Sequence, residues 1–124
     1  MIYEYMNTMG ALITLGLGIF GTFFPLRAAK FTGLSWETKE GFSEFRATFG
    51  GLFVALGLFP LVSGMPVAYV LVGIVWVFTS FGRVLSIFLD QGLTQKNIKA
   101  VLFEGGIGTL MLVGNFSFTI ELFR

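Results

Sequence analysis

The sequence contains no cysteine and no histidine, and these two absences exclude several kinds of chemistry. Without cysteine, the chain can form no disulfide, no thiolate metal site and no thiol nucleophile. Without histidine, it lacks the commonest general base, the commonest metal ligand and the usual axial ligand of haem. Only carboxylates remain for acid–base or hard-cation chemistry. The composition therefore predicts a protein that is not an enzyme and that holds no cofactor and no metal.

Charge is also scarce in this chain. Charged residues make up 12% of the sequence and apolar residues 55%, with a mean hydropathy of +0.85. An average soluble protein has about 25% charged residues. The net charge of +1 and the few scattered Lys and Arg residues provide no basic patch of the kind that nucleic acid requires. The sequence thus predicts a membrane protein that does not bind nucleic acid.

Long uncharged runs define the expected spans, since about 20 apolar residues in a helix cross a bilayer. The first run ends at Pro25. The run between Arg46 and Arg83 is too long for one span, and the turn signal Ser63-Gly64-Met65-Pro66 divides it. The predicted spans are residues 4–25, 44–63, 66–89 and 97–120. They predict an all-α fold with a single domain over residues 1–124, an integral membrane bundle of four transmembrane helices.

The basic residues near the span ends indicate an orientation. They are Arg27, Lys30 and Lys39 in the linker 26–43, and Lys96 and Lys99 around the linker 89–97. The opposite side has only Arg124 and the amino terminus. Because basic loops stay in the cytoplasm, we expect both long linkers to be cytoplasmic and both termini to lie outside. The expected location is the inner membrane of a bacterium, with several passes.

Polar residues at the edges of the spans, or inside them, are the candidate site, because charge within a membrane is costly and usually has a role. The candidates are Glu44, Arg46, Thr79, Arg83, Ser86, Asp90 and Glu104. Those from Thr79 to Asp90 recur at i, i+4, i+7 and i+11, on one face of a helix. Counted from the turn at Gly64, Arg46 and Arg83 lie at one depth, and Glu104 lies near it. We expect one cluster, in which Glu44 and Glu104 pair with the two arginines.

Local signals add detail to the helix ends and faces. Ser43 is a suitable N-cap for the second span, and Asp90 is expected to cap the third, with Gln91-Gly92 as the turn. One face of the fourth span carries Asn97, Glu104, Gly108, Met111 and Asn115. Polar groups on facing helices can satisfy one another where lipid cannot.

Three interpretations of the charged cluster stay open. In the first, the charges are structural ion pairs that fix the register of the helices. In the second, Arg46 and Arg83 bind an anionic ligand or headgroup while Glu104 takes up and releases a proton. In the third, Glu104 is a catalytic carboxylate that acts on lipids. Small residues on the first two helices, such as Gly18 and Gly57, likewise fit either internal packing or the docking of another chain.

Three motifs give a family resemblance. They are Glu44-Phe-Arg46-Ala47-Thr-Phe-Gly50-Gly51, then Gly82-Arg83-Val-Leu-Ser86 followed by Asp90-Gln-Gly92, and Glu104 early in the fourth span. Through these motifs the chain resembles a bacterial four-helix membrane family known only as domain of unknown function number 4345. The family pattern has Asp and Gly adjacent, whereas Gln91 separates them here. The resemblance implies a four-helix integral membrane protein and no particular activity.

The function predicted from the sequence is therefore a small, non-catalytic membrane protein, either a structural or accessory subunit or a protein that forms oligomers. Its expected partners are membrane lipids and other membrane chains, whether copies of itself or different proteins. The chain is small for an alternating-access transporter, since transporters are commonly built from larger repeated halves. The alternative is a binding or permeation protein that uses the Arg/Glu cluster for a small anionic or amphiphilic ligand, a lipid headgroup or a proton.

Overall fold

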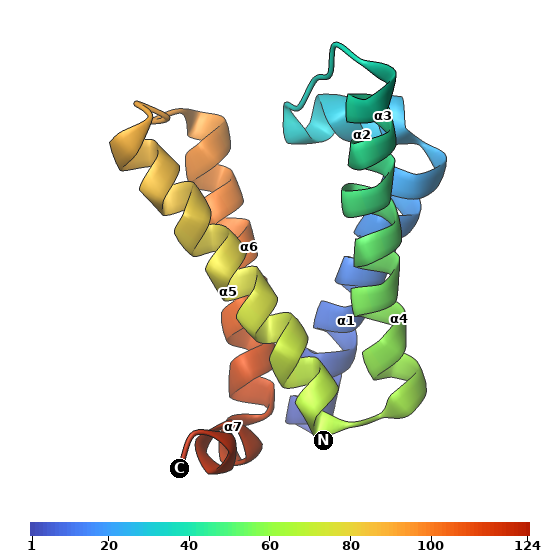
Figure 1. The fold of residues 1–124 in the computed structure, drawn as a ribbon. Coiled ribbons are helices and arrows are strands. Elements are labelled where there is room, and N and C mark those ends of the chain that lie inside the picture. The colour runs from blue at the N-terminus through green and yellow to red at the C-terminus, as the bar shows by residue number, and fades with distance from the viewer. The chain divides into compact units, whose positions relative to one another are not determined.

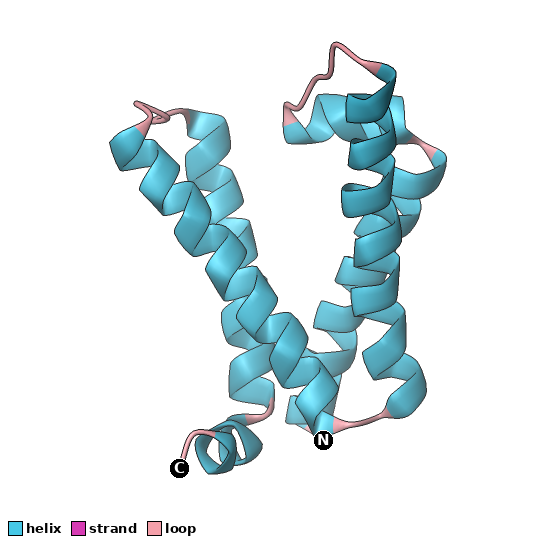
Figure 2. Ribbon diagram, viewed as in Figure 1, coloured by secondary structure: helices cyan, strands magenta, loops and turns pink.

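The computed structural model describes all 124 residues and contains helices but no strand (Figures 1 and 2). In chain order the helices are α1 (Ile2–Phe23), α2 (Pro25–Thr32), α3 (Lys39–Phe45), the π-helix η1 (Arg46–Leu52), α4 (Phe53–Ser63), α5 (Pro66–Leu89), α6 (Gln95–Gly114) and α7 (Phe116–Leu122). Four helical stretches are long and apolar enough to cross a membrane: Ile2–Phe23, Lys39–Ser63, Pro66–Leu89 and Gln95–Gly114. The all-α fold class is confirmed, and the four stretches indicate a multi-pass membrane protein.

The chain divides into two compact units, which are described separately below. Unit 1 comprises residues 1–10 and 64–124, and unit 2 comprises residues 11–63. Unit 1 thus contains the start of α1 together with α5, α6 and α7, whereas unit 2 contains the rest of α1 with α2, α3, η1 and α4. A single bundle over the whole chain stays a prediction.

Helix α5 begins and ends where the sequence predicted. Gly64 before it has φ +64°, a conformation that glycine adopts without steric cost. Pro66 occupies the first helical position, where its missing N–H needs no partner. Asp90 is the C-cap, and Gln91 follows with φ +55°.

The start of the second span lies earlier than predicted. The helix begins at Lys39, and its N-cap is Thr38, whose Oγ1 accepts a hydrogen bond of 3.0 Å from the Gly41 N–H. Ser43, the expected cap, lies inside α3. The indole of Trp36 stacks on the Phe42 ring, with centroids 4.7 Å apart. This aromatic contact across the helix start resembles a hydrophobic staple and favours the earlier beginning.

Unit 2 is held together by close approach of helix backbones. A Cβ added at Gly18 would meet the backbone of Phe53 and Val54, and one at Gly21 would meet that of Phe49. Small residues of this kind allow two helices to pack at short distance. The small residues predicted on the first two helices thus serve internal packing in unit 2.

An aromatic column adjoins this packing. The rings of Phe45, Phe49 and Phe53 stack in succession through η1, with centroids 5.0 and 5.9 Å apart. Phe45 is buried together with Ala28 and Ala29 of α2. The short helix α2 is therefore fixed to the second span by an apolar core.

The fourth span ends earlier than the predicted residue 120. Helix α6 stops at Gly114, Asn115 interrupts it, and α7 follows as a separate short helix. The Asn115 side chain donates from Nδ2 to the Met111 carbonyl at 2.9 Å. In a continuing α-helix that carbonyl would accept the Asn115 backbone N–H, which instead turns to the Leu112 carbonyl at 3.1 Å. Competition from the asparagine side chain explains the break.

The packing in unit 2 predicts unequal effects of alanine substitution at two glycines of α1. Gly18→Ala should lower the free energy of unfolding by about 1–3 kcal/mol, because the new methyl group would force the helix backbones apart. Gly16→Ala is the matched control, since a Cβ there meets nothing within 4 Å. The control should be neutral or stabilising by up to about 1 kcal/mol, from helix propensity. Unfolding by SDS titration in mixed micelles measures both, and equal effects would contradict this packing.

Candidate functional site

The centre of the candidate site is an ion pair between α5 and α6 in unit 1. Arg83 Nη2 donates to Glu104 Oε1 at 2.7 Å, and Arg83 Nε donates to Glu104 Oε2 at 3.0 Å. This two-point fork is the geometry in which arginine binds a carboxylate most strongly. The Glu104 side chain is 9% exposed, whereas the Arg83 side chain is 32% exposed. The carboxylate is thus enclosed, and the guanidinium lies at the edge of the cluster.

Asn97 extends the cluster toward the loop between the two helices. Its Oδ1 accepts a hydrogen bond of 3.1 Å from Arg83 Nη1, and its Nδ2 donates to the Gly92 carbonyl at 2.8 Å. The backbone N–H of Asn97 donates to Oγ1 of Thr94, the N-cap of α6. One amide side chain therefore joins α5, the loop and the first turn of α6. The sequence had placed Asn97 on the same helix face as Glu104.

Ser86 and Asp90 take part in this arrangement through their backbones. The Ser86 carbonyl accepts hydrogen bonds from the Asp90 N–H at 2.9 Å and from the Gly92 N–H at 3.3 Å. The second bond spans six residues, as at helix ends that close with a left-handed residue. Gln91 supplies that residue, so the expected turn at Gln91-Gly92 is confirmed. The turn presents the Gly92 carbonyl to Asn97.

Thr79 was expected on the inward face of the third span, but Ser80 occupies that place. Thr79 is exposed and bonds its own helix, from Oγ1 to the Val75 carbonyl at 2.8 Å. Ser80 is 8% exposed and donates from Oγ to the Val101 carbonyl of α6 at 3.0 Å. Buried Trp76, one turn before Ser80, marks the true inward face. Trp76 lies three residues before Thr79 and four before Ser80, so its spacing alone did not separate the two.

Glu44 and Arg46 belong to unit 2, and Glu44, one of the two carboxylates expected to pair with the arginines, forms no ion pair with Arg46. Glu44 accepts a hydrogen bond of 2.9 Å from the Thr48 hydroxyl, one turn further along. The Arg46 guanidinium lies over the Phe42 ring, 5.1 Å from its centroid. Both charged residues are exposed. An exposed cation over an aromatic face needs no carboxylate, because solvent and the ring share its stabilisation. The expected carboxylate partner of Arg46 was therefore wrong.

A second polar pair lies in unit 1, and the sequence analysis had singled out only one of its members. Asn7 of α1 and Asn115 exchange two hydrogen bonds, of 3.1 Å from Asn7 Nδ2 and 2.7 Å from Asn115 Nδ2. Asn115 is 9% exposed. A Cβ at the neighbouring Gly114 would meet Asn7 Oδ1, so glycine at this position leaves room for the amide pair. An asparagine within the predominantly apolar first span was the signal for Asn7.

The chemistry available to these groups is limited by their pairing. Arg83 and Glu104 neutralise each other, and both oxygens of Glu104 accept hydrogen bonds from Arg83. No group of three or more Asp and Glu residues is placed to hold a metal ion. The cluster therefore suits the fixing of two helices better than proton abstraction or nucleophilic attack.

No family model, curated protein or solved structure matches the chain. The resemblance to domain of unknown function number 4345 accordingly stays a prediction.

The ion pair predicts unequal effects of its two single substitutions. Arg83→Leu leaves the enclosed Glu104 carboxylate without a partner and should destabilise the protein by about 3–5 kcal/mol. Glu104→Leu should cost less, because the part-exposed Arg83 can reach water or lipid headgroups. The double substitution should recover most of the loss, since an apolar pair can replace a buried ion pair. Unfolding free energies in detergent test the cycle, and additive single effects would rule out the pairing.

The asparagine pair gives an independent prediction. Asn7→Ala should lower the free energy of unfolding by about 1–3 kcal/mol, because the buried Asn115 amide loses two of its partners. Thr8→Ala, an exposed neighbour on the same helix, should change it by less than about 0.5 kcal/mol. Thermal unfolding followed by far-ultraviolet circular dichroism compares the two. Similar melting temperatures for both variants would show that the amide pair is not formed.

Proposed function

We propose that this protein is a small, non-catalytic integral membrane protein that acts as a structural or accessory subunit, associating with other membrane chains or with copies of itself. The observation that carries the proposal is that the charged side chains of the α5–α6 cluster bind one another. Arg83 and Glu104 bind each other in a fork, and Asn97 takes a third guanidinium N–H. Charges used in this way stabilise a helix pair and present no reactive group to a substrate.

The outer surface supports the same proposal. Large apolar side chains are exposed on all four candidate spans, among them Leu12, Phe59, Phe78 and Leu102. In a membrane these surfaces contact lipid or other helices. A chain that carries little chemistry and much apolar surface fits an accessory role.

We place the protein in the inner membrane of a bacterium, with the linkers after α1 and α5 in the cytoplasm and both termini outside. The distribution of basic residues supports this orientation, because those two linkers and their borders contain most of the Lys and Arg outside the spans. Membership of the family of domain of unknown function number 4345 is part of the same proposal.

A second candidate function is the binding of a small anionic or amphiphilic ligand at Arg83. One observation favours it: the side chain is 32% exposed, and three of its five N–H groups are used by Glu104 and Asn97. The two remaining N–H groups could donate to a phosphate or carboxylate at the edge of the cluster.

The test is native mass spectrometry of the protein extracted with surrounding lipid from its own membrane at its natural level. An accessory subunit should appear in a larger complex of fixed stoichiometry. The matched apolar swap, Arg83→Leu with Glu104→Leu, should leave that complex intact, because the charges act only within the chain. Glu44→Gln, which removes an exposed charge from unit 2, serves as the control.

The same experiment can also contradict the proposed accessory role. A lone chain with a defined extra mass, lost in the double variant but kept in the control, would contradict the accessory role. It would establish ligand binding at Arg83 instead, and the extra mass would begin to identify the ligand.

A further inference from the structure

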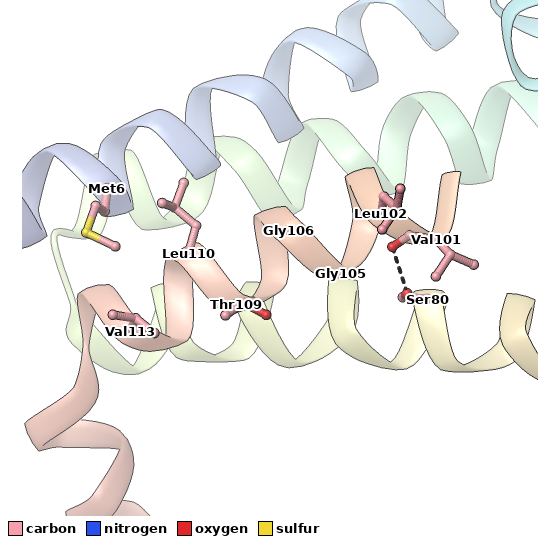
Figure 3. Close-up of a pocket in the computed structure, with 9 residues that line it drawn as sticks. All are labelled: Met6, Ser80, Val101, Leu102, Gly105, Gly106, Thr109, Leu110 and Val113. Atoms are coloured by element: carbon pink, nitrogen blue, oxygen red, sulfur yellow. Dashed lines mark hydrogen bonds between the residues drawn. The ribbon is translucent and has the colours of Figure 1, made fainter. Parts of the chain in front are cut away.

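An open groove of about 620 Å³ runs along α6 in unit 1 (Figure 3). Its lining consists of Met6, Ser80, Val101, Leu102, Gly105, Gly106, Thr109, Leu110 and Val113. Most of these side chains are apolar, and the Ser80 hydroxyl is already bonded to the Val101 carbonyl, as the dashed line in Figure 3 shows. The groove therefore has an apolar character along most of its length.

Glycines form part of the groove wall. A Cβ added at Gly106 would meet nothing within 4 Å, so the space over this residue is open. From Val101 to Val113 the groove extends about 18 Å along the helix, at about 1.5 Å per residue. Since α6 is one of the candidate spans, this length lies parallel to a membrane-crossing axis.

A basic residue, Lys99, lies near the start of α6, before the first groove residue of that helix. Lys99 is three residues before Leu102 and seven before Gly106, so the three residues share one helix face. Lys99 is exposed, and the first turn of α6 contains no acidic residue. Glu104 lies on another face, enclosed and bound to Arg83. Asp90, the C-cap of α5, lies ten residues after Ser80 and outside the lining of the groove.

We propose that the groove binds one acyl chain of an anionic phospholipid, with the lipid phosphate beside Lys99. The two parts of the surface match the two parts of such a lipid: an apolar channel along the span, and a positive charge at the membrane boundary. The positive end of the α6 dipole adds to the attraction for an anion at that boundary. The site does not use the Arg83–Glu104 pair, so it can stand or fail independently of the proposed accessory role.

The charge beside the groove favours an anionic lipid over a second helix. An apolar membrane helix could lie along the groove, but it would offer Lys99 no anionic partner. A phospholipid supplies both an acyl chain for the apolar lining and a phosphate for the cation.

The experiment uses the full-length protein in nanodiscs made of phosphatidylcholine with a minor fraction of phosphatidylglycerol. Native mass spectrometry after mild release counts the lipids that stay bound. The groove variant is Gly106→Phe, whose side chain would fill the open space. Gly82→Phe is the matched control, because Gly82 is also an exposed glycine with nothing within 4 Å and lies outside the groove. The headgroup variant is Lys99→Gln, and Lys39→Gln in unit 2 is its control.

The expected result is one retained phosphatidylglycerol on the wild type and on both controls. Gly106→Phe should lower its occupancy at least tenfold. Lys99→Gln should lower the preference for phosphatidylglycerol over phosphatidylcholine about fivefold, the effect of one basic residue near an anionic surface. Circular dichroism should show the same helical content in every variant, so that loss of binding is not loss of fold.

Two results would overturn the proposal. Equal lipid retention in Gly106→Phe and Gly82→Phe would mean that the lipid binds elsewhere. A dimeric wild type that Gly106→Phe converts to a monomer, with unchanged bound lipid, would mean that a second copy of the chain occupies the groove.

Discussion

The structure of unit 1 depends on the ion pair between Arg83 and Glu104. Each charge alone would be expensive in an apolar helix, and only their close contact, in a fork geometry, offsets the loss of hydration. The contact requires the two helices to approach closely. A Cβ at Gly108 would lie 2.9 Å from the Gly73 carbonyl oxygen, so small residues on both helices allow this approach. The pairing therefore sets the register of α5 against α6, and the glycines make that register sterically possible.

Once this register is fixed, the remaining polar groups have little freedom. Asn97 can reach both Arg83 and the Gly92 carbonyl because the turn after α5 ends with a left-handed residue. Toward the other end of α6, Asn115 stops the helix and binds Asn7. The apolar groove runs past the level of Glu104 along α6, but it lies on another face of that helix. The lipid site proposed for the groove therefore does not use the ion pair.

The sequence predicted the helical class, the bounds of α5 and the meeting of Arg83 with Glu104, because run length, turn residues and charge depth are all readable along the chain. It missed three features that depend on competition between local contacts. Thr38 rather than Ser43 caps the second span, because aromatic packing favours the earlier start. Helix α6 ends at Asn115, because the Asn115 side chain competes for a backbone carbonyl. The inward face of α5 was placed one residue away, at Thr79, since periodicity alone cannot separate adjacent polar residues in an apolar run.

The most direct test of the ion pair is magic-angle-spinning NMR of the full-length protein in a phospholipid bilayer, with arginine labelled with ¹⁵N and glutamate with ¹³C at the side-chain carboxyl. Arg83 Nη2 lies 2.7 Å from Glu104 Oε1, so we predict strong dipolar dephasing of the Arg83 Nη2 signal by the Glu104 carboxyl carbon. The Glu104→Gln variant carries no labelled carboxyl at residue 104, so it should lose this dephasing and thereby assign the signal. A guanidinium that instead shows strong coupling to lipid ³¹P, with none to Glu104, would contradict the account. The charges would then face the headgroups rather than each other.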